Sequence, residues 1–141
     1  MKKTSLISML PQILSSHKEW FSSKGKKGIF ADLSEEDLRE GNFRGCNLVE
    51  ANLQAADLCF ADFSNADLRG ANLLEAQLKG AKLQNANFEE TDLMWANLEG
   101  ANLENTKLDG AYLQGANLKG TEIKKAQIEL AFIDEDTQLP D

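Results

Sequence analysis

Residues 51–70 read ANLQAADLCFADFSNADLRG, and this stretch contains the pattern that decides the fold. Every fifth residue is small, and a large apolar residue follows it two positions later. The pattern continues without insertion or deletion from Ala31 to Glu135, which gives 21 units of five residues. All 21 large positions hold Leu, Phe or Ile, and Glu36 is the one exception among the small positions. Such a strict internal repeat predicts a solenoid.

The period of five fits neither a helix, with 3.6 residues per turn, nor a strand, with a repeat of two. The chain must therefore turn once in each unit, so that all the large side chains enter one interior. Stacked coils would then pair their backbones. In ten units the second residue after the large one is Gly or Asn, which suits a turn with a positive φ. These residues are Gly45, Asn65, Gly70, Gly80, Asn85, Gly100, Asn105, Gly110, Gly115 and Gly120.

The units that begin at Ala51, Ala56 and Ala61 read ANLQA, ADLCF and ADFSN. This A-(D/N)-L-x-x pattern resembles the pentapeptide-repeat family, whose members are bacterial and often cyanobacterial. The resemblance covers residues 31–135 and implies an all-β solenoid, a right-handed quadrilateral β-helix with four units per coil and about five coils. Such a rod would be roughly 25 Å long at about 4.8 Å per layer, with an interior too narrow for a ligand.

Residues 1–30 do not follow the repeat. Pro11 suits a first helical position, and we expect an amphipathic helix over residues 11–22. We predict that this helix caps the open end of the coils, because an uncovered edge invites aggregation. The alternative is a membrane-surface or partner-binding helix, since six lysines lie nearby. The face of the predicted helix consists of Ile13, Leu14, His17, Trp20 and Phe21. The predicted divisions are residues 1–30 (cap and basic loop), 31–135 (21 repeats) and 136–141 (tail).

Charge is distributed unevenly along the chain. Residues 1–30 hold six Lys and one Glu, a net charge of +5, whereas residues 31–141 hold nine basic and 22 acidic residues, net −13; the sum is the −8 of the whole chain. Direct nucleic-acid binding by the acidic rod is disfavoured, because phosphate contacts need clustered Lys and Arg. No stretch is long and apolar enough for a membrane span. Cys46 and Cys59 match no disulfide framework or zinc pattern, which favours free thiols and a cytoplasmic location.

The sequence offers little for catalysis. His17 is the only histidine, and no nucleophile or carboxylate can be assigned to it at the spacing of a catalytic triad. The Asp and Asn residues before each large residue form regular ladders, which suit solvated or backbone-bonding side chains better than a metal site. No glycine-rich phosphate loop precedes a helix. We therefore expect no catalytic residues, no cofactor and no metal, and a protein that is not an enzyme.

With four units per coil, every fourth unit belongs to one face of the rod. The face that begins with Ala31 carries acidic residues outward and no basic residue. An exposed apolar cluster rimmed by acids is typical of a protein contact. The alternative is that these side chains only stack on one another along the face. The candidate contact residues are Leu74, Met94, Trp95, Tyr112 and Phe132.

Two functions fit these features. The first is a non-enzymatic scaffold or protein-binding module with an unidentified protein partner. The alternative, which the resemblance to family members related to quinolone resistance implies, is an acidic DNA mimic that binds a DNA-handling enzyme such as DNA gyrase. A homodimer could form through the Trp95 and Tyr112 face or through the C-terminal end, where Leu130, Ile133 and Leu139 lie.

Overall fold

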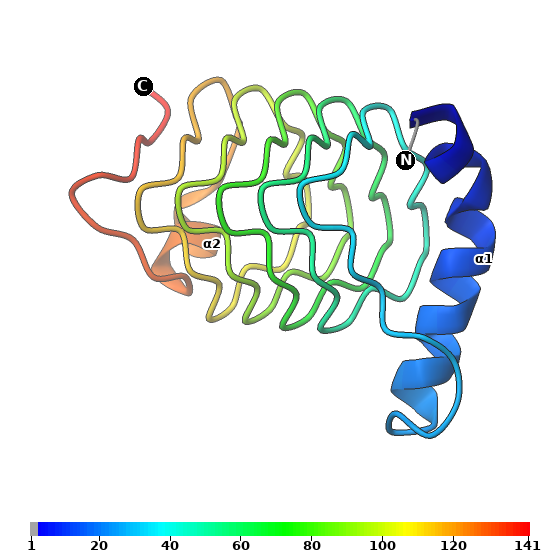
Figure 1. Cartoon of the computed structure of the whole chain (residues 1–141). Coiled ribbons are helices and arrows are strands. Elements are labelled where there is room, and N and C mark those ends of the chain that lie inside the picture. Colours follow the sequence, from blue (N-terminus) through cyan, green and yellow to red (C-terminus); the bar gives the residue numbers. More distant parts are fainter. Residues whose placement is uncertain (1–2) are drawn as a thin grey trace.

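The computed structural model describes residues 3–141. It contains two helices, α1 (Lys3–Ser22) and α2 (Lys125–Glu129), with the repeat region between them. Figure 1 shows the repeat region as a stack of coils, with α1 lying across one end of the stack and the C-terminus at the other. In the described residues, extended backbone occurs as isolated parallel bridges rather than as longer strands.

The bridges fix the register between coils. From Asp32 to Phe132 they join residues that are 20 positions apart, such as Asp32 with Asn52 and Asn52 with Asn72, so four units of five residues make one coil. The last bridge, Asn117 with Gln138, spans 21 positions. Each coil is held to the next by main-chain hydrogen bonds. The Leu53 N–H donates to the Asn72 oxygen at 2.8 Å, and the Asn72 N–H donates to the Ala51 oxygen at 2.9 Å. Backbone pairing between coils, predicted from the repeat, is therefore present.

The large residue of each unit lies in the interior, as predicted, from Leu33 to Leu118. None of these 18 side chains is more than 3% exposed. The interior side chains stack from coil to coil, as Phe43 and Phe63 show with parallel rings and centroids 4.6 Å apart. Burying a side chain of this size contributes about 1.5–3 kcal/mol, so these stacks are the main stabilising feature of the rod.

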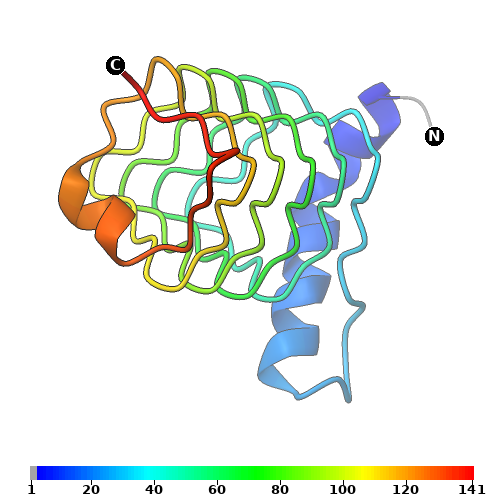
Figure 2. The same cartoon turned by 90° about the vertical axis from the view of Figure 1, so that its left-hand side faces the viewer.

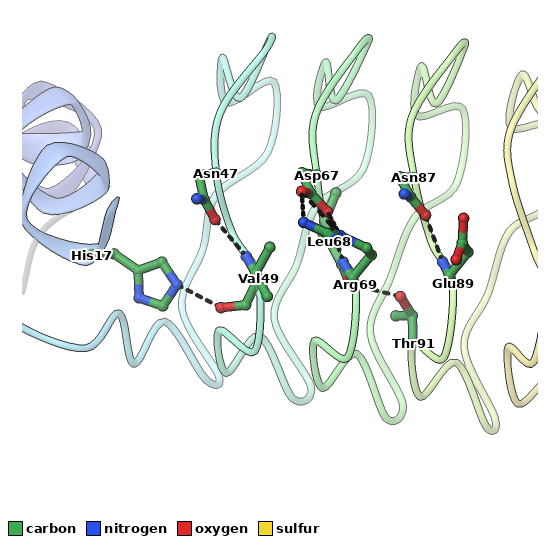
Figure 3. A network of polar contacts seen from close by, with 9 residues as sticks. All are labelled: His17, Asn47, Val49, Asp67, Leu68, Arg69, Asn87, Glu89 and Thr91. Atoms are coloured by element: carbon green, nitrogen blue, oxygen red, sulfur yellow. Dashed lines mark hydrogen bonds and ion pairs between the residues drawn. The ribbon is translucent and has the colours of Figure 1, made fainter. Parts of the chain in front are cut away.

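The corner of each unit has a positive φ, from Glu35 to Gly120. All ten Gly and Asn residues predicted at corners adopt it. The ladder of Asp and Asn side chains supports the approach to the corner. Asn47 Oδ1 accepts the Val49 N–H at 3.0 Å, and the same contact recurs in the next two coils of this face (Figure 3). The backbone-bonding role expected for the ladder is thus confirmed at these positions.

Helix α1 is longer than the predicted helix over residues 11–22. It begins at Lys3, so placing Pro11 at the first helical position was wrong, because Pro11 lies inside the helix. Proline costs the helix one backbone hydrogen bond. Burial of Leu6 and Leu10 against the coils, at 5% and 3% exposure, offsets that cost and extends the helix backwards.

The coils depart from the predicted repeat after Gly120. Residues 125–129 form α2, although the repeat pattern continues to Glu135. The residues of α2 include good helix formers, such as Lys125, Ala126 and Gln127, and the Gln127 side chain accepts the Lys124 N–H at 2.8 Å. The tail then returns to the stack, where the Leu118 N–H donates to the Gln138 oxygen at 2.7 Å.

Candidate functional site

The aromatic face is the side of the rod formed by the units that begin at residues 31, 51, 71, 91, 111 and 131. The bridges that join Asp92 to Tyr112 and Tyr112 to Phe132 place these residues at one position of successive coils. The rings of Tyr112 and Phe132 stack with centroids 5.2 Å apart. Both remain open to solvent, at 41% and 52% exposure, so stacking on each other does not bury them.

Trp95 lies at a corner of the same face. Its φ is 60°, and its side chain is 55% exposed. Its main-chain N–H donates to the main-chain oxygen of Gln114 in the next coil at 2.9 Å. The indole ring lies against Gly115, where an added Cβ would collide with the ring. Gly115 thus provides the space that lets the indole lie against the next coil while its other side faces solvent.

Two aliphatic side chains complete the predicted cluster. Leu74 and Met94 are half-buried, and their N–H groups are bonded to the side chains of Asn72 and Asp92 at 3.0 Å each. The fold therefore brings the five predicted residues to one face, with the three aromatic side chains the most exposed. Their role as a protein contact stays a prediction.

Among the residues that the structure describes, the carboxylates of the aromatic face carry no ion pair. Within residues 3–141, the ion pairs lie on the other faces and in α2, as in Arg69–Asp67 at 2.8 Å and Arg44–Asp62 at 3.5 Å. Hydrogen bonds from the Ser34 side chain and main chain lower the pKa of Asp32, so this carboxyl stays ionised. The aromatic face therefore combines exposed rings with uncompensated negative charge.

His17 joins α1 to the first coil (Figure 3). Its ring is fully buried; Nδ1 accepts the Ala31 N–H at 2.9 Å, and Nε2 lies 2.8 Å from the Val49 oxygen. Because a main-chain N–H can only donate and a carbonyl can only accept, the ring must carry its proton on Nε2. The ring stacks on Trp20 with centroids 5.5 Å apart. Both nitrogens thus bind main chain, which makes His17 a structural tie.

Of the other predicted residues of the helix face, Leu14 belongs to the buried core and Ile13 packs against it. Trp20 and Phe21 are half-buried, and the Trp20 ring contacts His17 and Phe30. Sequence reasoning missed Leu6 and Leu10, which belong to the same buried cluster. Their signal was present, because Leu6, Leu10 and Leu14 recur at the four-residue spacing of a helix face.

Cys46 and Cys59 are free, half-buried thiols. Burial raises the pKa of the Cys46 thiol, and burial followed by the Asp57 carboxylate raises that of Cys59. Across residues 3–141, no three His, Cys, Asp or Glu side chains gather closely enough to hold a metal ion. None of the helices in that range has the length and apolar character needed to cross a membrane.

Known proteins match this chain in its repeat region. The family model for pentapeptide repeats matches residues 29–59, 61–100 and 96–132, with eight copies. Among solved structures, HetL, a pentapeptide-repeat protein involved in heterocyst differentiation regulation in the cyanobacterium Nostoc sp. strain PCC 7120, is 44% identical over 62% of this chain, with a TM-score of 0.62. This chain covers 37% of the HetL chain. No curated protein gave a significant match.

Two further structures cover more of the chain. The pentapeptide-repeat protein Rfr23 from the cyanobacterium Cyanothece 51142 is 28% identical, with a TM-score of 0.66, over 78% of this chain and 85% of its own. The pentapeptide-repeat protein alr5209 from Nostoc PCC 7120 is 25% identical, with a TM-score of 0.63, over 90% of this chain and 84% of its own. Both matches extend beyond the residues shared with HetL.

Proposed function

The chain belongs to the pentapeptide-repeat family, and from that premise we propose that it is a non-enzymatic scaffold that binds a partner protein through the aromatic face. Proteins of this family fold as right-handed quadrilateral β-helices and are generally structural or protein-binding rather than enzymes. In this chain the rod comprises about five coils, with α1 as its N-terminal cap. The free thiols Cys46 and Cys59 suit a reducing compartment such as the cytoplasm.

The observation that carries the proposal is the exposure of Trp95, Tyr112 and Phe132 on one face, at 55%, 41% and 52%. Trp and Tyr are enriched among the residues that dominate interface energetics. The carboxylates of this face have no cationic partner in the described chain. We therefore expect a partner segment with apolar side chains and a Lys or Arg, since opposite charge favours encounter and a cation can lie over an aromatic ring.

The test compares two charged variants in a pull-down from the native host. The double substitution Trp95→Glu, Tyr112→Glu places charge on the aromatic face. Phe60→Glu is the matched control, because Phe60 also occupies a corner, is 57% exposed and lies against a glycine on another face. A partner that binds the wild type and Phe60→Glu, but not the double variant, supports the proposal. Equal capture by all three proteins contradicts it.

Self-association is tested separately by light scattering. The aromatic face and the C-terminal end, where Leu130 and Ile133 are 56% and 41% exposed, are the two surfaces considered for a homodimer. Loss of a dimer on Trp95→Glu, Tyr112→Glu assigns it to the aromatic face. A dimer that persists in that variant excludes the aromatic face as the self-contact.

DNA mimicry is the second candidate function, and the net charge of −13 over residues 31–141 favours it. A narrow acidic rod can present carboxylates where duplex DNA presents phosphates. Arg39, Arg44 and Arg69 pair with carboxylates on the other faces. The carboxylates of the aromatic face have no ion pair in the described chain, and neither have Glu50, Glu89, Glu90 and Asp109 of the face that begins at Cys46, so mimicry would use these two faces. Unchanged supercoiling by DNA gyrase at micromolar excess of this protein would exclude gyrase as the target.

A further inference from the structure

Segment 121–130 interrupts the last part of the stack, and the residues on both sides of it, Lys119 and Phe132, are in register with the coil beneath. Before it, the Gly100 N–H donates to the Lys119 oxygen at 2.9 Å. After it, the Phe132 N–H donates to the Ala111 oxygen at 2.8 Å, as in every regular coil. The ten residues of segment 121–130 lie between these two points, and ten residues are the length of two units.

The coil beneath the interruption has an open backbone edge. The N–H groups of Leu103, Asn105 and Leu108 have no acceptor within the described protein. One coil earlier, the equivalent N–H of Leu83 donates to the Asn102 oxygen at 2.9 Å. A cavity of about 700 Å³ is lined by residues 100–109 and by residues of the segment that contains α2. Figure 2 shows α2 at the outer side of the stack of coils.

A side chain occupies part of the vacant position. The Gln127 Nε2 donates to the main-chain oxygens of Leu103 and Thr106, at 2.8 Å and 2.9 Å. In the coil below, the oxygen equivalent to that of Thr106 belongs to Ala86, and it accepts the Lys107 main-chain N–H at 3.0 Å. The amide of Gln127 thus stands in for a main-chain donor that a regular coil would supply.

Segment 121–130 keeps the interior pattern of the repeat. Thr121 and Ala126 are small, and Ile123 and Ile128 follow them at the large positions. In a regular coil all four side chains would point inward, and here Thr121 does so. In this structure Ala126 is exposed and both isoleucines are only partly buried. The sequence of the segment therefore fits an interior that it does not occupy when α2 is formed.

We propose that the open edge over residues 101–109 is a strand-acceptor site whose occupant is segment 121–130 of the same chain. The segment alternates between α2 and two further repeats that close the coil. Residues outside the segment keep their pairing, because Lys119 and Phe132 are already in register. The Gly110 N–H, which here donates to the Leu130 oxygen at 2.7 Å, would donate to the Glu129 oxygen, as Glu90 donates to Asp109 one coil earlier.

Closure exchanges the α2 bonds, including those of Gln127, for regular main-chain bonds. By analogy with the coil below, the N–H groups of Leu103, Asn105 and Leu108 would donate to the main-chain oxygens of Glu122, Lys124 and Gln127. In the other direction, the N–H groups of Glu122 and Gln127 would donate to the main-chain oxygens of Ala101 and Thr106.

Amide hydrogen exchange by NMR on the full chain tests this two-state segment. Ala126→Lys is compatible with α2, because Ala126 is exposed there, and incompatible with closure, because residue 126 would point inward. We expect the amides of Leu103, Asn105 and Leu108 to be protected in the wild type. Ala126→Lys should lower that protection at least about tenfold. Glu122→Lys introduces the same side chain at a position that is exposed here and faces outward in a closed coil, so it is the matched control and should leave the protection unchanged.

Several results would overturn the proposal. Equal exchange in the wild type and Ala126→Lys would mean that α2 alone shields these amides. Protection that rises with protein concentration would assign the site to a second copy. The Leu83 amide, one coil away, reports whether Ala126→Lys remains folded. If Ala126→Lys does not remain folded, methyl contacts between Ile128 and Leu108 are measured by NMR in the wild type instead. Their presence supports closure, and their absence refutes it.

Discussion

Replacing His17 with Ala should detach α1 from the first coil. The substitution leaves the Ala31 N–H and the Val49 carbonyl without partners in a site where His17 is fully buried. Each unpaired group costs about 1–3 kcal/mol. Loss of the ring contact with Trp20 costs about 0.5–1.5 kcal/mol more. The free energy of unfolding should therefore fall by about 3–7 kcal/mol, which is a large part of the stability of a small domain.

Urea denaturation followed by intrinsic fluorescence measures this loss. Lys18→Ala is the matched control, because Lys18 is the exposed neighbour of His17 on α1 and should change stability by less than about 0.5 kcal/mol. Hydrogen exchange at the Ala31 amide gives a second, local readout, which should accelerate only in His17→Ala. A loss below about 1 kcal/mol, together with an unchanged Ala31 amide, would refute the role of His17 as the tie.

Other substitutions test the coils themselves. Leu93→Ala should cost about 2–5 kcal/mol in thermal or urea unfolding, because Leu93 is fully buried; a loss below about 0.5 kcal/mol would contradict its interior position. Glu40→Gly should stabilise the protein by about 0.5–1 kcal/mol in the same assay, because a φ of 61° is strained for Glu; destabilisation would count against strain at that corner. Gly115→Ala should displace the Trp95 indole and shift its N–H resonance in NMR, since the new Cβ collides with the ring. An unshifted indole N–H resonance would contradict the contact between the ring and Gly115. Hydrogen bonds lower the pKa of Asp32 in the folded state, so the ionised carboxylate stabilises the fold above the unfolded pKa, and this stabilisation is lost as pH falls through the folded pKa. Asp32→Asn should therefore make the free energy of unfolding fall less steeply at acid pH. The same acid dependence in both proteins would show that the contribution of Asp32 is negligible.

The coils could be predicted from the sequence because the repeat is simple and strict. A period of five leaves one way to place Leu53, Leu58 and Phe63 in a common interior, and the same period assigns Trp95 and Tyr112 to one face. The stacking of Trp95 on Gly115 could not be foreseen, because it depends on the orientation of the ring at a strained corner.

The ends of the chain were harder to predict. The main-chain partners of His17 lie 14 and 32 residues away, so no local pattern reveals them. The start of α1 depends on Leu6 packing against the coils, and this outweighs the breaking effect of Pro11. At the other end, the small and large positions of the repeat continue through segment 121–130, so the interior pattern predicts further coils. Helix α2 forms instead from residues of good helix propensity, and the Gln127 side chain accepts the Lys124 N–H at its start.

Photo-crosslinking from the aromatic face tests the proposed function most directly. A benzoylphenylalanine at position 112, introduced in the native host, would replace the ring that stacks on Phe132, on the face that also carries Trp95. The same residue at position 60 would report on another face. Mass spectrometry should identify a partner protein linked through position 112 and absent from position 60. Equal crosslinking from both positions, or none from position 112 while the partner is captured from position 60, would contradict the proposed function.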